Sequence, residues 1–230
     1  MTSLAGSSWP GLPGAPVVVV PLGSVEQHGH HLPLGTDTSV ACAVAEAAVA
    51  MLDDVLLAPA LAYGASGEHE GFPGTISIGT EALTGLLVEY GRSACRWARR
   101  VLIVNGHGGN LDALRAAVPL LRSEGRDVGW FPCGIAGGDA HAGRTETSLM
   151  LHVEPEWVRG DGDAGVTTPI GELLPRLRAE GVRAVSPTGV LGDPAGASAE
   201  EGEALLAGLV GRLVAAARDW TVDAHGRVRG

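Results

Sequence analysis

Short apolar runs alternate with longer amphipathic stretches along most of the chain. Apolar and largely β-branched residues fill positions 17–20, 101–104 and 128–131, and turn-forming or polar residues bound these runs. Runs of this length and composition are typical of strands that are buried on both faces. A further extended segment is predicted over residues 56–63. We therefore expect a sheet of buried strands at the centre of the molecule.

Helices are expected between these strands. Six stretches have the composition and spacing of helices, namely residues 38–52, 81–100, 111–123, 145–152, 171–179 and 199–220. Thr38 or Ser39 is the expected N-cap of the first helix, and Ser198 is that of the last. Strands that alternate with helices predict an α/β fold with a mainly parallel sheet.

The ends of the chain lack this alternation. Residues 1–16 are rich in Ser, Gly and Pro and are predicted to form an irregular arm, and residues 221–230 are predicted to form a polar tail. Residues 65–79 are rich in glycine and too polar for a core, so a functional loop is expected there. We find no internal repeat and no domain boundary, which predicts a single domain over residues 1–230.

Three loops follow predicted strands and carry polar side chains. Ligands of open α/β sheets bind beyond the carboxyl ends of the strands, which directs attention to residues 22–37, 105–110 and 134–146. The first loop carries Glu26 and His28, which point the same way if the segment is extended. Its proline and glycines can bend the loop and bring Asp37 back beside them.

The second loop holds His107 between Asn105 and Asn110, the only asparagines of the chain. Asparagine amides can orient a ligand or bind substrate, and Asn110 can also cap the helix that follows; both roles can hold together. The third loop carries His141 and Glu146. Glu146 falls at the start of a predicted helix, where capping alone would also explain a carboxylate.

The donors of the three loops suit a divalent metal. Two imidazoles and three carboxylates favour Zn²⁺, Mn²⁺ or Fe²⁺ over a thiolate-bound structural zinc. Five protein ligands are too many for one open tetrahedral site, so we expect two ions that share a carboxylate. Two ions roughly 3.5–4 Å apart would produce a hydroxide near neutral pH and polarise a carbonyl, which predicts hydrolysis of an amide or a related bond. The expected ligands are Glu26, His28, Asp37, His107 and Glu146.

Composition removes several other classes of protein. The chain has no lysine, which excludes a Schiff-base lysine and a phosphate loop. A formal net charge of −10 argues against nucleic acid as a partner. No apolar run approaches the roughly 18 residues of a membrane helix, and the start of the chain does not resemble a secretory signal. Cys42, Cys95 and Cys133 are odd in number and far apart, which predicts buried thiols in a cytoplasmic protein.

The loop segments resemble those of the creatininase family of metal-dependent amidohydrolases. The matching segments are residues 23–29, 32–34 with 36–37, 105–110, and 141–143 with 146–148. The resemblance implies a three-layer α/β/α sandwich, assembly into a homo-oligomer, the five metal ligands named above with Asp37 bridging, and His141 as the acid–base group beside Glu146. Creatininase itself has a glutamate two residues after the histidine that matches His107. Gly109 occupies that position here, which argues against creatinine as the substrate and leaves Glu146 as the expected replacement.

One subgroup of this family is similar over further segments. These segments are residues 63–69, 74–81, 89–93, 124–130, 184–186 and 189–194. Members of the subgroup are peptidases that release a modified C-terminal Val-Tyr unit from a short ribosomal precursor peptide. The resemblance therefore implies a short modified precursor peptide as the partner and substrate. The residues expected to contact it are Ser66, Glu68, His69, Phe72 and Asn110.

Two other functions remain open at this point. The first is a family amidohydrolase that acts on a small cyclic amide or an N-formyl compound. The second is a non-catalytic scaffold of a peptide-maturation assembly, in which metal has only a structural role. Five hard donors together with an additional histidine argue against the scaffold.

Overall fold

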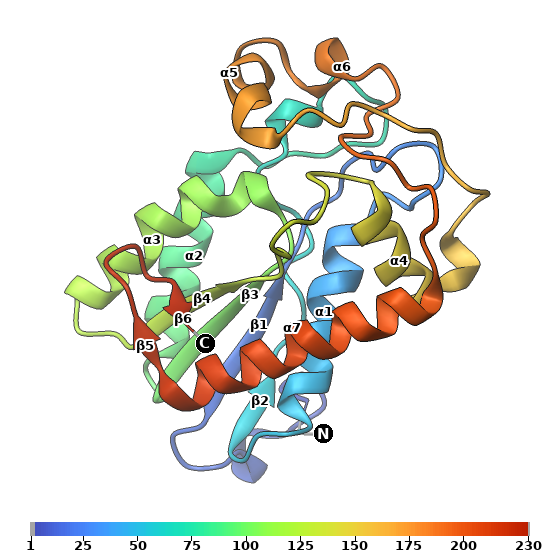
Figure 1. Ribbon diagram of the computed structural model, residues 1–230. Helices are drawn as coiled ribbons and strands as arrows, with labels where there is room; N and C mark the ends of the chain where they lie inside the picture. Colours follow the sequence, from blue (N-terminus) through green and yellow to red (C-terminus); the bar gives the residue numbers. More distant parts are fainter. Residues whose placement is uncertain (1–2, 230) are drawn as a thin grey trace.

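A four-stranded parallel sheet forms the centre of the computed structural model, which describes residues 3–229 (Figure 1). Its strands are β1 (Val17–Leu22), β2 (Val55–Leu57), β3 (Arg100–Asn105) and β4 (Val128–Pro132), arranged in the order β2-β1-β3-β4. All neighbouring strands are parallel, as predicted. The extended segment predicted over residues 56–63 is mostly not a strand, because the chain leaves the sheet after Leu57 and rejoins it only through a bridge between Leu61 and Leu22.

Helices cover both faces of this sheet (Figure 1). One face is covered by α1 (Thr36–Val49), α4 (Arg144–Val153) and α7 (Ala199–Asp219), and the other by α2 (Thr80–Ala94) and α3 (Leu111–Ser123). Val17 and Val19 of β1 pack into the first layer, whereas Val18 and Val20 pack into the second. Successive side chains of a strand point to opposite faces, so an uninterrupted apolar run fills both layers. The expected three-layer α/β/α sandwich is confirmed.

Shorter elements lie beyond the carboxyl ends of the strands. Helices α5 (Ile170–Glu180) and α6 (Val182–Val185) pack there against the 3₁₀ turn η2 (Gly67–His69) (Figure 1). Leu173, Leu177 and Val182 form a small apolar cluster with Phe72 packed against it. The remaining 3₁₀ turns are η1 (Trp9–Gly11), η3 (Gly108–Asn110) and η4 (Pro155–Trp157). The cluster fixes η2 over the loops that leave the sheet.

Three predicted helix boundaries are wrong by two residues or more, and one of them is the end of the first helix, which lies at Val49 instead of residue 52. The helix expected over residues 81–100 ends at Ala94, because Arg100 already pairs with Val17 in the sheet and cannot also be helical. The first helix begins at Thr36 rather than after Thr38 or Ser39. The hydroxyl of Thr36 donates to the carbonyl of Pro33 at 2.7 Å and closes that turn. Asp37 consequently lies in the first turn of α1 instead of in a loop.

The predicted polar tail is a hairpin as far as residue 229. Strands β5 (Thr221–Val222) and β6 (Val228–Arg229) pair antiparallel beside β4. Val228 is buried against Gly129, where a side chain on the glycine would collide with it. A strand with one buried residue has no periodicity to detect, which is why the sequence pattern missed it. In the N-terminal arm, Ser3 bridges to Leu57; residues 1–2 of the arm and residue 230 of the tail lie outside the described residues.

Two further expectations concern cysteines and membranes. Cys133 is buried as expected, whereas Cys42 and Cys95 are only partly buried. Among residues 3–229, no helix combines the length and the apolar character needed to cross a membrane.

The topology places the loops of interest side by side. Strand β2 lies on one side of β1 and β3 lies on the other, so the winding of the chain reverses between β1 and β3. Open α/β sheets bind ligands in the crevice at such a reversal. Leu22 and Asn105, the last residues of β1 and β3, are register partners. The loop carrying Glu26 and the loop carrying His107 therefore leave the sheet next to each other.

Candidate metal centre

The structure brings the five predicted metal ligands to one place. Glu26 and His28 come from the loop after β1, Asp37 from the first turn of α1, His107 from the loop after β3, and Glu146 from the first turn of α4. Four of the five are at most 5 % exposed, and the side chain of Glu146 is 24 % exposed. Ionisable groups are seldom buried so completely unless they are paired or bind a metal.

Asp37 lies between two histidines. Its Oδ1 is 3.3 Å from Nε2 of His28, and its Oδ2 is 3.2 Å from Nδ1 of His107. The hydroxyl of Ser24 also donates to Oδ2 at 2.5 Å. Burial by itself would raise the pKa of Asp37, but the charge of His28 and hydrogen bonds from both rings hold it well below its ordinary value. The N-terminus of α1 adds a favourable dipole, so Asp37 is a stable carboxylate with one oxygen facing each ring.

The two rings that face Asp37 retain their protons to high pH. Burial lowers the pKa of His28, but the neighbouring Asp37 carboxylate outweighs this and raises it to about 10. Burial likewise opposes protonation of His107, while Glu26 and Asp37 raise its pKa to about 9. In the metal-free protein these imidazolium groups supply the positive charge that the carboxylates require. The same positions would suit divalent cations, which bind the deprotonated rings.

The carboxylate of Glu26 lacks hydrogen-bond donors. Both carboxylate oxygens are buried and neither has a hydrogen-bond partner. Oε1 lies 3.3 Å from Nε2 of His69 and Oε2 lies 3.1 Å from Nε2 of His107, without hydrogen-bond geometry. Burial raises the pKa of Glu26 to about 7. A buried carboxylate without donors is costly, and a cation bound at this point removes the cost, so the donor set fits a metal.

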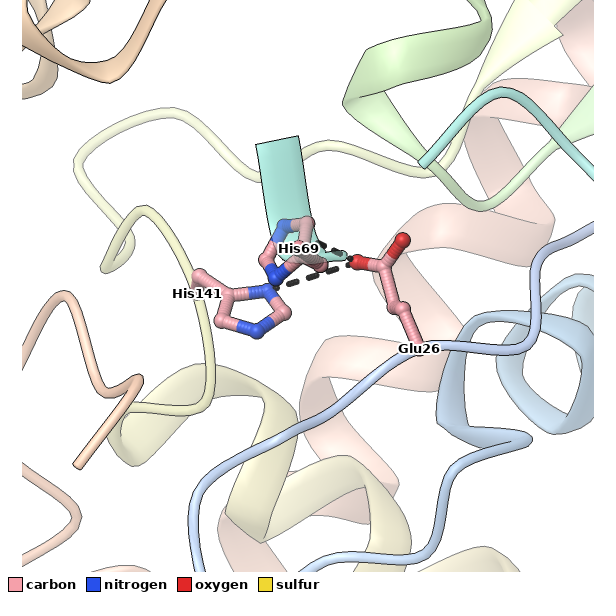
Figure 2. A group of neighbouring side chains, drawn as sticks. All are labelled: Glu26, His69 and His141. Atoms are coloured by element: carbon pink, nitrogen blue, oxygen red, sulfur yellow. Dashed lines mark ion pairs between the residues drawn. The ribbon is translucent and has the colours of Figure 1, made fainter. Parts of the chain in front are cut away.

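Two further histidines flank Glu26 (Figure 2). Nδ1 of His141 is 3.8 Å from Oε1 of Glu26, the same oxygen that His69 approaches. Burial lowers the pKa of His69 to about 3 and that of His141 well below its ordinary value, so both rings are neutral near pH 7. The ring centroid of His141 is 4.3 Å from that of His28 and 4.5 Å from that of His69. The sequence placed His69 among the substrate contacts, and the structure brings it directly to the donor cluster.

Glu146 approaches the cluster from α4. Its Oε2 accepts a hydrogen bond of 2.6 Å from the backbone N–H of Ala142 and lies 3.9 Å from Nε2 of His28. Ala142 adopts a φ of 52°, a left-handed conformation that is uncommon for a residue with a side chain and marks local strain. That conformation directs its N–H at Glu146.

Three groups of three residues have donor atoms that all lie within 4.8 Å of one another. The groups share residues, and together they contain more donors than one ion requires. The groups are Glu26, His69 and His141; His28, His141 and Glu146; and Glu26, His28 and Asp37.

The other expected substrate contacts have different surroundings. Ser66 is buried with its hydroxyl 3.3 Å from Nε2 of His107, and Glu68, whose side chain is 32 % exposed, has Oε1 3.7 Å from the same nitrogen. Phe72 packs toward α5 and α6, with the guanidinium of Arg183 above its ring. All of these groups lie on or beside η2.

Asn110 links separate segments of the fold. Its amide oxygen accepts from the N–H of Ala65 at 2.9 Å. Its amide nitrogen donates to the carbonyl of Gly23 at 3.0 Å and to the side-chain oxygen of Asn105 at 3.1 Å. These bonds tie the loops after β1 and β3 to the segment that leads into η2.

Two polar residues of the site were not singled out in the sequence. Ser24 binds Asp37, and Gln27 lies between His69 and His141. Both lie in the loop that carries Glu26 and His28, and Gln27 is the single glutamine of the chain. Only this position indicated a role for them.

Comparison with known proteins shows the family of this chain. The family model named creatininase, described as creatinine amidohydrolase, matches residues 7–217. The chain belongs to the creatininase family, as its motifs predicted. A protein of Mycolicibacterium smegmatis named mycofactocin precursor peptide peptidase is 56 % identical over 217 residues, covering 92 % of this chain and 88 % of that protein. A creatinine amidohydrolase of Pseudomonas putida is 32 % identical over 222 residues, covering 83 % and 84 %.

Solved structures show the same architecture. A structure titled creatininase Mn superposes with a TM-score of 0.79 at 28 % identity, covering 95 % of this chain and 98 % of that one. A mutant creatininase described as Zn-Zn type also has a TM-score of 0.79 at 28 % identity, with coverage of 96 % and 99 %. The buried His and Glu cluster of this chain thus lies in a fold whose relatives are described with zinc or manganese.

Proposed function

We propose that the protein is a metal-dependent peptidase that releases the modified C-terminal Val-Tyr unit from the mycofactocin precursor peptide. The proposal rests on the buried carboxylate of Glu26, which has no hydrogen-bond partner and is surrounded by histidines and further carboxylates. A bound cation would stabilise the ionised form of such a group, and a divalent cation in a crevice at the sheet reversal is suited to hydrolysis. The 56 % identity to a protein named as this peptidase supports the choice of substrate.

Five residues are proposed to hold two divalent ions. The position of Asp37 supports two ions instead of one, because each of its oxygens faces a different histidine and the carboxylate could serve both ions. Zn²⁺, Mn²⁺ and Fe²⁺ all suit this mixture of imidazole and carboxylate. When bound, the ions lower the pKa of a water and polarise the scissile carbonyl. The proposed ligands are Glu26, His28, Asp37, His107 and Glu146.

His141 is the proposed acid–base residue. Its Nε2 lies 2.8 Å from the carbonyl oxygen of Gln27, which anchors the ring and leaves Nδ1 facing the cluster. Nδ1 can take up a proton and deliver it to the nitrogen of the scissile bond as the amine leaves. Glu146 accepts the N–H of Ala142, the residue after His141, and so also holds this segment in position.

The peptide is proposed to bind over η2 and the adjoining loops. Ser66, Glu68 and His69 border the cluster, and Phe72 lies farther along the same segment. Asn110 is proposed to contribute by holding these loops together. Assembly into a homo-oligomer and a cytoplasmic location remain predictions.

The test is cleavage of the modified precursor peptide, followed by mass spectrometry. We expect the C-terminal fragment to be released by metal-loaded protein, to be absent after treatment with a chelator, and to return when Zn²⁺ or Mn²⁺ is added. Hydrolysis of a small cyclic amide or an N-formyl compound in place of the peptide would overturn the substrate. Metal-loaded protein that hydrolyses none of these would overturn the enzymatic function and support the scaffold.

A further inference from the structure

Gln27 connects the two neutral histidines that flank Glu26. It is the single glutamine of the chain and is 5 % exposed. Its backbone N–H donates to the hydroxyl oxygen of Thr75 at 3.2 Å. Its side-chain nitrogen lies 2.7 Å from Nδ1 of His69, and its backbone oxygen lies 2.8 Å from Nε2 of His141. Every polar group of this residue therefore has a neighbour.

The neighbours determine which way the Gln27 amide faces. The backbone N–H of Gly29, which can only donate, lies 2.9 Å from Oε1, so this atom must be the amide oxygen. Nε2 then carries both amide hydrogens, and it lies 2.7 Å from Nδ1 of His69, 3.0 Å from Nε2 of His141 and 3.3 Å from the carbonyl oxygen of Gly189. Nδ1 of His69 accepts, and in a neutral ring the proton is then on Nε2, 3.3 Å from Oε1 of Glu26.

His141 faces the same carboxylate oxygen with its other nitrogen. Nε2 of His141 lies 2.8 Å from the carbonyl oxygen of Gln27, which can only accept, and 3.0 Å from the Gln27 amide nitrogen, which can only donate. The amide nitrogen has two other acceptors for its hydrogens, Nδ1 of His69 and the carbonyl of Gly189, whereas the carbonyl needs a donor, so we assign the proton of His141 to Nε2. Its Nδ1 is then a lone pair, 3.8 Å from Oε1 of Glu26. Figure 2 shows a nitrogen of each ring facing the same carboxylate oxygen of Glu26. With the proton on Nε2 of both rings, the nitrogen of His69 that faces Glu26 is an N–H, and the nitrogen of His141 that faces it is a lone pair.

We propose that Gln27 is a positioning residue that holds His69 as a hydrogen-bond donor at the site and prevents it from ligating the metal. A ring that binds a metal through Nε2 has its proton on Nδ1, and that proton would point at the donating amide of Gln27. The N–H of His69 consequently faces Glu26 and can donate a hydrogen bond to the substrate bound there, while His141 exchanges protons. The catalytic part of this inference rests on the proposed hydrolysis.

Two substitutions of Gln27 distinguish the hydrogen-bonding role of its amide from the packing role of its side chain. Gln27→Met keeps the approximate volume and removes the amide, so Nε2 of His69 is no longer fixed as a donor. We expect kcat to fall about 10- to 100-fold, with KM and metal content nearly unchanged. Gln27→Glu replaces the donor by an acceptor, which moves the His69 proton to Nδ1 and frees Nε2 for the metal. We expect a similar loss of kcat together with tighter metal binding in competition with a chelator.

Ser186→Ala is the matched control. Ser186 is 1 % exposed, and its hydroxyl donates to the carbonyl of Val190, beyond the contacts of the cluster. Ser186→Ala removes a buried hydrogen bond away from the cluster, so it should cost stability while kcat stays at the wild-type value.

The deciding measurement is independent of activity and is made on the wild-type protein. Two-bond ¹H–¹⁵N spectra of the wild-type protein loaded with Zn²⁺ report the tautomer of each histidine, with His69→Gln and His141→Gln used to assign the signals. We expect a proton on Nε2 of His69 and no metal at that nitrogen. A proton on Nδ1 of His69, or a kcat of Gln27→Met within about twofold of wild type, would overturn the inference. Failure of the wild type to cleave the peptide would overturn the proposed function and leave the tautomer result standing.

Discussion

Nδ1 of His107 lies 3.2 Å from Oδ2 of Asp37, although one follows β3 and the other begins α1. The contact exists because β1 and β3 are neighbours whose last residues are in register. The other oxygen of Asp37 faces His28. A single carboxylate therefore joins the two halves of the proposed metal centre, and the first predictions concern the charges around it.

Glu26→Gln should abolish metal binding but should not destabilise the metal-free protein at pH 8. Removal of this carboxylate should lower metal affinity by at least about 10²-fold, because Glu26 is a proposed ligand. Burial raises the pKa of Glu26 to about 7, so its ionised form at pH 8 is a cost that the amide avoids. Metal analysis and thermal unfolding with and without metal measure the two effects.

Glu70→Gln is the control for this prediction. Glu70 is exposed at the end of η2, one residue after His69. Its substitution should leave metal content unchanged. Normal metal content in Glu26→Gln would contradict the proposed ligand set.

His141→Gln should reduce turnover while metal remains bound. Loss of a general acid–base group lowers kcat by about 10²- to 10⁴-fold. His141 is also close enough to Glu26, His28 and Glu146 to be a ligand itself. Metal content measured beside kcat distinguishes these roles, and a variant that loses its metal would make His141 a ligand.

The metal-free protein should lose stability as the pH rises above neutrality. The folded protein raises the pKa of His28 to about 10 and that of His107 to about 9. Both values lie above the ordinary value of about 6.5, so their contribution to stability is complete below that pH and is lost as the pH rises through the folded-state values. We expect Tm to fall by at least about 4 °C between about pH 7 and about pH 9.

Metal should remove most of this pH dependence, because bound ions replace the protons on the two rings. The same scan of the double variant His28→Gln/His107→Gln should be nearly flat. A wild-type metal-free protein whose Tm does not change over this range would show that neither ring is held in its charged form.

Gly109→Ala should destabilise the protein and displace His107. A Cβ at this position would lie 2.3 Å from the carbonyl oxygen of Ala65, and a second close contact would be with the ring of His107. Overpacking of this kind costs about 1–3 kcal/mol, measured by denaturant unfolding. Gly108→Ala is the matched control in η3, because a Cβ there meets nothing within 4 Å. Equal effects of the two substitutions would contradict the steric explanation.

The sequence predicted the sheet, most of the helices and the loops that carry the proposed ligands because burial and strand order leave a pattern along the chain. A short run such as residues 101–104 is apolar at every position. This composition is typical of a strand whose two faces are both covered by other elements. The order of strands and helices then predicts parallel pairing, and the rule for open sheets selects the loops. The boundaries were less certain, as at Ala94, because pairing with a distant strand ends a helix that local propensity would continue.

The hairpin of β5 and β6 and the position of Asp37 show what local patterns omit. Val228 is buried only because Gly129 leaves room for it on β4. Asp37 lies in the first turn of α1 because the hydroxyl of Thr36 donates to the carbonyl of Pro33 and closes the turn before it. Each depends on contacts that hydrophobic periodicity does not record.

By itself, the sequence determined the α/β architecture, the family and which residue types would meet at the carboxyl ends of the strands. Only the tertiary structure decided how those groups face one another, including the placement of His69 at Glu26 and the role of Gln27. The amide of Gln27 meets rings 42 and 114 positions away along the chain. Burial leaves a periodic record in the sequence because it acts on whole faces of helices and strands. The direction of a single hydrogen bond leaves no periodic record in the sequence. It depends on a few atoms from distant segments that the fold holds within about 3 Å of one another.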